Sequence, residues 1–258
     1  MKKLTLFING SLGLQVLQKM VELKKDVRII GVVLNSIEKR APEYLDEVKK
    51  TIGNPLPLLV DYENNANTHE QIANLLSDSD FGISALFGHK LPIEALNIVN
   101  GQIINLHPSL LPIGRGADPI PWSIIEQTKQ GISIHLIDNE LDTGDILFQK
   151  EIPTDIGMNA GKIYQIATDE LFHEFNKIFS DWINKKVTFF KQANVETKTH
   201  KSIELNDKRI IRENETGTFG DFLRIIQSLT FSDGRGPILQ DDSSKLWDIK
   251  IVITPKLD

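Results

Sequence analysis

Two kinds of apolar pattern alternate along the first 185 residues of the chain. Short apolar or β-branched runs predict buried strands, and apolar residues spaced three or four apart predict amphipathic helices. The predicted strands are Leu4–Ile8, Val27–Leu34, Pro57–Val60, Phe81–Phe87, Gln102–Leu106, Gly131–Ile137 and Ile146–Ile152. The predicted helices are Leu12–Leu23, Glu70–Leu76 after the cap Thr68, a short helix that begins near Pro92, and Asn159–Ile183. Strands that alternate with helices predict an α/β fold with a mainly parallel sheet and helices on its faces.

The pattern changes in the C-terminal part of the chain, where Asn194–Glu213 is polar and irregular. Phe219–Leu229 predicts a short helix and Leu246–Ile253 predicts a terminal strand. The apolar residues of this tail suit a small subdomain that packs on the rest, because a stretch this short rarely supports a core of its own. We therefore predict a main domain over residues 1–185 and a small C-terminal subdomain or flap over residues 186–258.

Composition narrows the class of protein. The chain has 258 residues, 40% of them hydrophobic and 25% charged, which is ordinary for a globular protein. A formal net charge of −6 disfavours a nucleic-acid partner bound through a large basic field, and without cysteine there is no disulfide or thiolate metal site. The run Leu4–Ile8 is too short for a signal-peptide core, and no stretch is long enough to span a membrane. The sequence thus predicts a cytoplasmic protein with neither a membrane nor a nucleic-acid partner.

An amide and an imidazole stand at the end of one predicted strand. Asn105 and His107 are two residues apart, so their side chains point to the same side of an extended strand. Pro108 cannot donate to a sheet, so we expect the strand to end there and to leave both side chains at its mouth. A histidine that only caps the strand end is the alternative, and Asn is common at such junctions. An amide donor beside a group that exchanges protons near neutral pH favours acyl transfer.

The Asp-rich loop Asp138–Asp145 joins the last two predicted strands. Asp and Gly are typical turn formers, so a plain turn is one alternative. The loop also holds four carboxylates, but their spacing lacks the twelve-residue ligand pattern of a calcium-binding helix–loop–helix. We expect no metal, and we predict that the carboxylate of Asp142 orients and stabilises a protonated histidine.

Two other segments carry groups that suit a phosphate or a carboxylate. Gly10-Ser11-Leu12-Gly13 lies between a predicted strand and a predicted helix, where backbone amides would bind a phosphate or simply form a tight turn. The dinucleotide-binding fingerprint is absent, because Leu12 and Gln15 occupy its second and third glycine positions. Arg115 lies in a flexible loop and is either a two-pronged clamp for an anion or an exposed loop residue.

Other polar and aromatic residues are weaker candidates. Phe231, Arg235 and Trp247 lie in the tail, where a flap over a substrate would need an aromatic ring or a cation. Trp122 and Trp182 lie on predicted helices and are expected to pack in the core or between domains. Four histidines have no partner pattern and receive no role: His69, His135, His173 and His200.

Four segments occur together in an order that points to a known family. They are Phe87-Gly88-His89-Lys90-Leu91-Pro92, Asn105-Leu106-His107-Pro108-Ser109-Leu110-Leu111-Pro112, Arg115-Gly116 with Pro119, and Leu141-Asp142-Thr143-Gly144-Asp145-Ile146-Leu147. Over about residues 1–185 the chain resembles the formyltransferases that use 10-formyltetrahydrofolate. The resemblance implies a Rossmann-like fold and a catalytic trio that, by matched position, consists of Asn105, His107 and Asp142.

The resemblance also implies where the folate binds. Its pteridine is expected between the segment Phe87–Leu91 and the loop Ile137–Asp142, largely against backbone groups. His89 and Lys90 depart from the residues that several members of the family have there. The implied cofactor-binding residues are Phe87, Gly88, His89, Leu91, Ile137, Asp138 and Glu140.

Within the family, the tail is similar to that of the bacterial nucleotide-sugar N-formyltransferases. Methionyl-tRNA formyltransferases carry a longer C-terminal barrel, and glycinamide ribonucleotide formyltransferases end soon after the long helix and have a fuller Gly-rich loop. Phe222–Phe231 looks like the segment that follows the catalytic domain in the nucleotide-sugar branch, although Ser232–Pro237 departs from its usual Pro- and aromatic-rich continuation. Enzymes that act on dTDP-4-amino-4,6-dideoxyglucose for O-antigen and lipopolysaccharide synthesis look closest, and a homodimer is the assembly considered. The implied acceptor-binding residues are Gly10, Ser11, Lys90, Ser109, Arg115 and Phe231.

The expected reaction is direct attack of a sugar amine on the formyl carbon. Asn105 donates to the developing oxyanion, and His107 either accepts a proton from the amine or stands beside the oxyanion as an imidazolium. Asp142 supports the charged imidazole or relays the proton through water. The alternatives are a methionyl-tRNA or glycinamide ribonucleotide formyltransferase, a formyl-folate hydrolase in which water replaces the amine, and a non-catalytic folate or nucleotide binder. The three intact residues argue against the binder.

Overall fold

The computed structural model describes residues 1–92, 96, 102–231 and 236–254, which group into two compact units. The first unit consists of residues 1–107, 133–148 and 169–192. The second consists of residues 108–132, 149–168 and those from 193 onward. The division of the chain at residue 185 stays a prediction, and the short helix predicted to begin near Pro92 lies outside the described residues.

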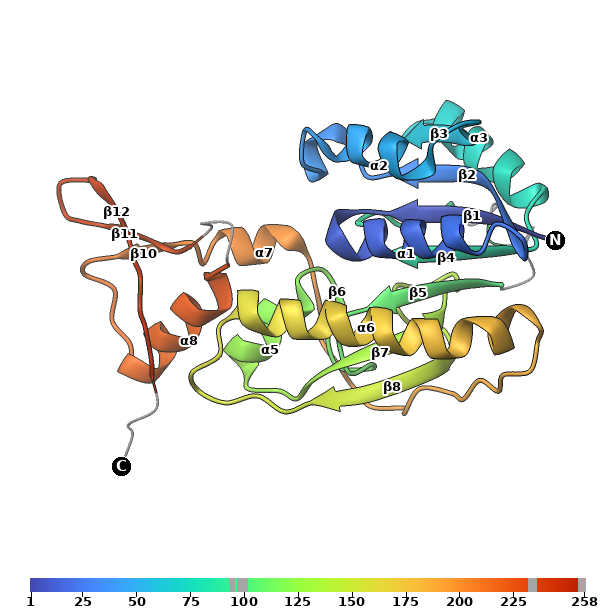
Figure 1. Cartoon of the computed structure of the whole chain (residues 1–258). Coiled ribbons are helices and arrows are strands. Elements are labelled where there is room, and N and C mark those ends of the chain that lie inside the picture. The colour runs from blue at the N-terminus through green and yellow to red at the C-terminus, as the bar shows by residue number, and fades with distance from the viewer. Residues whose placement is uncertain (93–95, 97–101, 232–235, 255–258) are drawn as a thin grey trace. The chain divides into compact units, whose positions relative to one another are not determined.

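The first unit is organised by a sheet of seven strands among the described residues, in the order β3-β2-β1-β4-β5-β7-β8 (Figure 1). All neighbouring strands from β3 to β5 are parallel, and β7 pairs antiparallel to β5. The predicted mainly parallel sheet is therefore confirmed. Strands β7 and β8 also contribute residues to the second unit. The strands are β1 (Lys2–Ile8), β2 (Val27–Leu34), β3 (Leu58–Asp61), β4 (Phe81–Ala85), β5 (Ile103–His107), β7 (Gln130–Leu136) and β8 (Ile146–Ile152).

Two strands show how the sequence sets their ends. β2 spans the predicted Val27–Leu34, because its β-branched residues suit a parallel strand in the interior of the sheet. β4 ends at Ala85 and not at the predicted Phe87, because Leu86 takes a left-handed backbone conformation with φ 57°. That conformation cannot continue a strand and turns the chain into the segment that begins with Phe87.

Helices pack along this sheet, and Figure 1 shows α1 running next to β1 and β4. The predicted cap Thr68 is wrong, because Asn65 caps α3: its Oδ1 accepts from the Thr68 backbone N–H at 2.9 Å. Trp182 on α6 is buried and contacts Phe81 edge-on at 5.0 Å between ring centroids, which confirms it as a core residue. The helices are α1 (Gly10–Glu22), the 3-10 helix η1 (Ile37–Lys39), α2 (Tyr44–Ile52), α3 (Ala66–Ser77) and α6 (Ala160–Ile183), whose first residues belong to the second unit.

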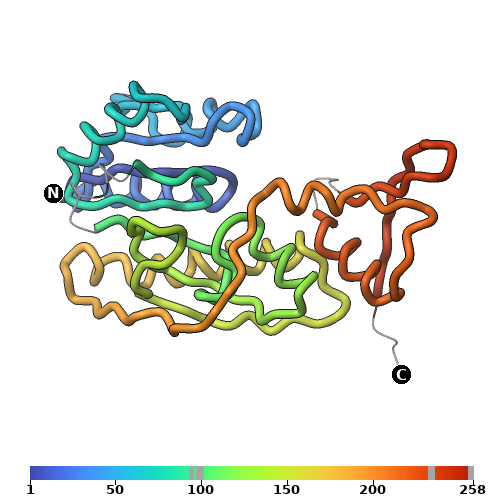
Figure 2. Tube along the Cα trace, turned by 180° about the vertical axis from the view of Figure 1, so that it is seen from behind, coloured from blue at the N-terminus to red at the C-terminus, as the bar shows by residue number. Residues whose placement is uncertain are grey.

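The chain turns back after α6 and runs next to β8 (Figures 1 and 2). Phe190 and Ile146 exchange backbone hydrogen bonds of 2.8 and 2.9 Å, which fixes this return. Residues up to Gln192 therefore belong to the first unit.

The second unit contains short elements, several of them in the stretch Asn194–Glu213 that was expected to be irregular. The apolar pattern of this stretch is weak and does not reveal these elements. They depend instead on pairing with distant residues. For example, β6 pairs parallel to β9. β12 ends at Asp248 and not at the predicted Ile253, since its partner β11 offers only three residues. The elements are β6 (Arg115–Gly116), α5 (Pro119–Glu126), β9 (Thr199–His200), α7 (Ser202–Asn206), β10 (Ile210–Arg212), α8 (Phe219–Leu229), β11 (Ile238–Gln240) and β12 (Leu246–Asp248).

Candidate active site

Strand β5 places Asn105 and His107 as the sequence predicts. The strand ends at His107, directly before Pro108. In the antiparallel pair with β7, Asn105 lies opposite His135 and His107 lies opposite Ser133. Because residues two apart share a face, the amide and the imidazole reach the same side of the sheet.

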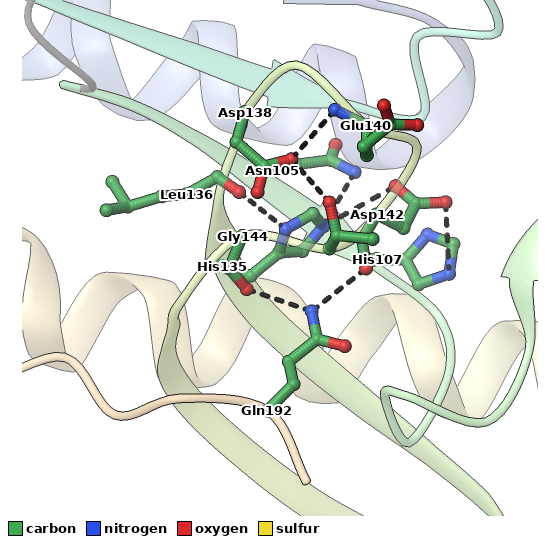
Figure 3. Close-up of polar contacts among 10 residues, drawn as sticks. Asn105, His107, His135, Leu136, Asp138, Glu140, Asp142, Gly144 and Gln192 are labelled. Carbon is green, nitrogen blue, oxygen red and sulfur yellow. Dashed lines mark hydrogen bonds and ion pairs between the residues drawn. The ribbon is translucent and has the colours of Figure 1, made fainter. Parts of the chain in front are cut away.

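The Asp142 carboxylate lies between two imidazoles (Figure 3). Its Oδ2 is 3.9 Å from His107 Nε2, and its Oδ1 is 3.6 Å from His135 Nε2. The Asp142 side chain is only 11% exposed and both imidazoles are buried, so solvent screens this charge weakly. The structure thus brings together Asn105, His107 and Asp142, three residues from two separate segments.

His135 is the residue of this cluster that the sequence did not reveal. Its Nδ1 donates to the Leu136 carbonyl at 2.7 Å, which leaves Nε2 as an acceptor for Asn105 Nδ2 at 3.2 Å. Burial, together with the nearby His107, lowers the pKa of His135 to about 4, so its ring is neutral at neutral pH. His135 thus has partners in the cluster, although the sequence shows no partner pattern for it. Only the register that pairs Asn105 with His135 would have revealed it, and apolar periodicity does not give a register.

Local contacts hold the loop that carries Asp142. Asp142 adopts a left-handed conformation with φ 55°, which costs an ordinary residue on the order of 1–3 kcal/mol. Asp138 Oδ1 accepts from Thr143 Oγ1 at 2.7 Å and from the Glu140 backbone N–H at 3.3 Å. Gly144 packs so closely that a Cβ atom there would lie 1.9 Å from the Leu136 carbonyl oxygen. The loop therefore requires glycine at this position.

The segment after β4 borders a cavity of about 450 Å³. Asn35 Oδ1 accepts from the Gly88 backbone N–H at 2.9 Å, and Lys39 Nζ donates to the Gly88 carbonyl at 3.1 Å. These contacts fix the backbone of the segment from both sides. The cavity is lined by Tyr62, Asn64, His69, Gly88, His89, Lys90, Leu91 and Pro92.

One wall of this cavity is aromatic. Tyr62 and His89 stack with their centroids 4.1 Å apart, and the Phe87 ring lies 5.5 Å from Tyr62 and 5.4 Å from His89. Burial and the charge of Lys39 lower the pKa of His89 to about 4, so the wall is uncharged at neutral pH. Phe87 and Ile137 also pack against the same hydrophobic cluster. The two segments expected to bind folate thus share one structural support.

The predicted acceptor residues fall in both units. In the first, Gly10 begins α1 in a left-handed conformation with φ 60°, Ser11 follows it, and Lys90 lines the cavity. In the second, Ser109 is buried, Arg115 lies in β6, and Phe231 contacts Tyr164 edge-on at 6.4 Å. The acceptor role of these six residues stays a prediction.

Trp122 and His200 form a second aromatic contact, within the second unit. Their rings stack 3.8 Å apart, and Trp122 belongs to a hydrophobic cluster with Leu205 and Leu229. Packing is therefore the observed role of Trp122. No helix within the described ranges is long and apolar enough to cross a membrane. Among these same residues, no group of three or more His, Asp or Glu side chains is placed to hold a metal ion.

Comparisons with known proteins point to one family. Residues 2–174 match the formyl transferase family. Over 136 residues the chain is 38% identical to a methionyl-tRNA formyltransferase from Clostridium perfringens, covering 52% of this chain and 43% of that protein. Over 190 residues it is 28% identical to a dTDP-4-amino-4,6-dideoxyglucose formyltransferase from Mycobacterium tuberculosis. This match covers 72% of this chain and 79% of that protein. The match thus spans less than half of the clostridial protein.

Solved structures share the fold. A sugar N-formyltransferase from a Shewanella species superposes with a TM-score of 0.83 at 20% identity, with 100% of each chain covered. An N-formyltransferase from Helicobacter canadensis, in complex with folinic acid and dTDP-3-aminofucose, superposes with a TM-score of 0.70 at 21% identity. The match covers 92% of this chain and 84% of that one. The predicted Rossmann-like α/β fold is confirmed.

Proposed function

Because the chain belongs to the formyl transferase family, we propose that it transfers the formyl group of 10-formyltetrahydrofolate to the amino group of a nucleotide-linked sugar. The observation that carries the proposal is the cluster of Asn105, His107 and Asp142, in which a donor, a proton carrier and a carboxylate meet at the end of β5. Oxyanion donors and proton-transfer groups of these kinds accelerate acyl transfer.

The donor is proposed to bind between the segment Phe87–Leu91 and the loop Ile137–Asp142. The cavity of about 450 Å³ has the volume of a small-molecule pocket, and its stacked Tyr62 and His89 suit a planar heteroaromatic ring. Bound there, the folate supplies an activated formyl carbon. We assign Phe87 and Ile137 to support of this wall, Gly88, His89 and Leu91 to its lining, and Asp138 and Glu140 to the facing loop.

Asn105 is proposed to stabilise the negative charge that develops on the formyl oxygen. One N–H of its amide points to His135 Nε2, so the other remains for the reacting oxygen. The neutral His135 keeps the amide nitrogen turned this way. Removal of one such preorganised donor typically costs about 100- to 1,000-fold in rate.

His107 is proposed to take the proton of the attacking amine and to deliver it to the folate nitrogen, so that the bond from this nitrogen to the formyl carbon breaks and tetrahydrofolate leaves. Asp142 Oδ2, 3.9 Å from His107 Nε2, would stabilise the ring while it carries a positive charge. The other oxygen of this carboxylate lies 3.6 Å from His135 Nε2. Relay of the proton through water is the alternative role that we propose for Asp142. Acid–base assistance of this kind typically contributes about 100- to 10,000-fold.

The acceptor is proposed to be dTDP-4-amino-4,6-dideoxyglucose. The relative from M. tuberculosis that bears this name matches over 72% of the chain, and the full-length fold match to a sugar N-formyltransferase includes the tail. Gly10, Ser11, Lys90, Ser109, Arg115 and Phe231 are the proposed acceptor residues. Within this proposal the enzyme acts as a homodimer in the cytoplasm and serves O-antigen or lipopolysaccharide synthesis.

Methionyl-tRNA is the second candidate acceptor, favoured by the 38% identity to the clostridial enzyme. The test uses the purified full chain with 10-formyltetrahydrofolate and, in separate reactions, dTDP-4-amino-4,6-dideoxyglucose, the corresponding UDP and GDP amino sugars, glycinamide ribonucleotide, methionyl-tRNA, or no amine. Formylated product is identified by mass spectrometry. We expect product with the dTDP sugar and its loss in His107→Asn. Product with methionyl-tRNA alone, or folate turnover without any amine, would replace the proposal.

A further inference from the structure

One side chain binds two carbonyls of the Asp142 loop. Gln192 Nε2 lies 2.9 Å from the Asp142 carbonyl oxygen and 2.8 Å from the Gly144 carbonyl oxygen (Figure 3). An amide nitrogen has two hydrogens, so it can donate one to each carbonyl. Gln192 thus bridges the two residues on either side of Thr143.

This bridge acts on the most constrained backbone of the site. Asp142 is left-handed, and such a conformation persists only where surrounding contacts impose it. Asp138 accepts a hydrogen bond from the Thr143 hydroxyl. The Gln192 amide donates to the carbonyls of the two residues that flank Thr143. The direction of the Asp142 backbone in turn sets where its carboxylate lies between His107 and His135.

The position of Gln192 is itself fixed. Two residues earlier, Phe190 exchanges two backbone hydrogen bonds with Ile146 at the start of β8. Gln192 is half-buried against the loop, whereas its neighbour Lys191 is 86% exposed and makes a surface ion pair with Asp145 at 2.9 Å. Surface pairs of this kind contribute little, so Lys191 offers a matched control in the same stretch of chain.

We propose that Gln192 is a positioning residue for the formyl transfer: it holds the backbone of Asp142 so that the carboxylate faces both imidazoles. The inference rests on the proposed function. Gln192 acts through Asp142 and contacts no reacting atom. Its loss is therefore expected to lower kcat, because misplacement of a group by about 1 Å can cost about 100-fold in rate. The KM of each substrate is expected to stay nearly constant.

The test compares Gln192→Met, which keeps the length and removes both donors, with the control Lys191→Met. We expect kcat to fall about 10- to 100-fold in Gln192→Met, with KM within about threefold of wild type, and to stay within about twofold in Lys191→Met. Gln192→Glu provides a second readout. The ionised carboxylate of Glu has only acceptor oxygens, which repel the two carbonyl oxygens. The protonated carboxyl has one O–H group that can donate to one of them. The kcat of Gln192→Glu relative to wild type should therefore rise as the pH is lowered, while that of Gln192→Met stays flat.

Thermal unfolding of each variant is measured first. Gln192→Asn, which is one methylene too short to reach both carbonyls, replaces the Met variant if that variant does not fold. A kcat within twofold of wild type in both Gln192→Met and Gln192→Glu would overturn the proposal, as would a flat Gln192→Glu ratio. Histidine-ring NMR titration of the full chain gives a readout without turnover: Gln192→Met should move the His135 titration, and Lys191→Met should not. An unchanged His135 titration would overturn the positioning role, whereas an inactive wild type would overturn only the proposed function.

Discussion

The amide of Asn105 and the imidazole of His135 face each other across the β5–β7 pair, with 3.2 Å between Nδ2 and Nε2. Because His135 gives its Nδ1 hydrogen to the Leu136 carbonyl, its Nε2 can only accept. An amide turned the other way would set two lone pairs against each other. The contact therefore decides which end of the Asn105 amide is the donor.

Asn105→Asp tests this orientation. The carboxylate removes the donor for the reacting oxygen and faces the His135 lone pair, so we expect kcat to fall about 100- to 1,000-fold with far smaller changes in KM. Steady-state kinetics with both substrates measure this. Asn184→Asp, at an exposed position after α6, is the matched control and should keep wild-type kinetics. An Asn105→Asp enzyme within a few-fold of wild-type kcat would contradict the assigned donor role.

The neutral His135 predicts an acid-sensitive fold. Its pKa is lowered to about 4 from 6.5, so the unfolded state binds more protons between these values. Stability is therefore complete above about pH 6.5 and falls as the pH drops toward 4, by up to about 1.4 kcal/mol per pH unit for this group. Urea unfolding at several pH values measures the slope.

His135→Gln should be less stable at pH 7.5 and lose less further stability on acidification. His89→Gln is the matched comparison, because the pKa of His89 is also lowered to about 4 and contributes to the same pH window. If the stability of His135→Gln depends on pH as strongly as that of the wild type, the His135 ring is already charged in the folded wild-type protein.

The sequence predicted what depends on local pattern. The β-branched run of β2 set its ends, and Pro108 set the end of β5. Alternation along a strand then placed Asn105 and His107 on one face, because side-chain direction in a strand has a fixed period of two. These features need no knowledge of distant residues.

The features that the sequence could not predict depend on strand register and on a segment that turns back to pair with a distant strand. His135 enters the site because β7 pairs with β5 in one register out of several, and its residue type alone did not distinguish it. Gln192 enters because the chain turns back after α6 and pairs at Phe190, in a stretch with no apolar pattern. The left-handed conformation of Leu86, which ends β4 early, likewise has no signal in the residue type, because leucine rarely adopts it.

Tyr62→Leu tests the cavity as the donor site. The substitution removes the ring that stacks on His89 and should raise the KM for 10-formyltetrahydrofolate about 3- to 10-fold, as the loss of one aromatic contact suggests. At saturating folate, kcat should stay close to wild type, because Tyr62 is not in the Asn105 cluster. Phe219→Leu, at a ring that is 76% exposed, is the control. An unchanged KM in Tyr62→Leu would place the donor elsewhere.

His200 predicts a second pH effect, in the second unit. Its Nδ1 lies 2.9 Å from Glu204 Oε2 and its Nε2 lies 3.1 Å from Glu126 Oε1, with Lys198 Nζ 3.6 Å from the same Glu126 oxygen. The hydrogen bond from His200 holds the pKa of the Glu204 carboxyl below its ordinary value. A lowered carboxyl pKa stabilises the fold above the unfolded value of about 4.3, and this stabilisation is lost as the pH falls through the folded value.

His200→Gln should therefore lower the Tm at pH 7 and reduce the further loss of Tm below about pH 4.5. The two ring nitrogens of His200 contact different carboxylates, whereas both hydrogens of a glutamine amide lie on one nitrogen, so the amide reaches one of the two. Thermal unfolding followed by circular dichroism between pH 3.5 and 8 measures both effects, with His173→Gln at an exposed position of α6 as the control. If His200→Gln follows the wild-type Tm at every pH, the paired carboxylates do not use this imidazole to stabilise the second unit.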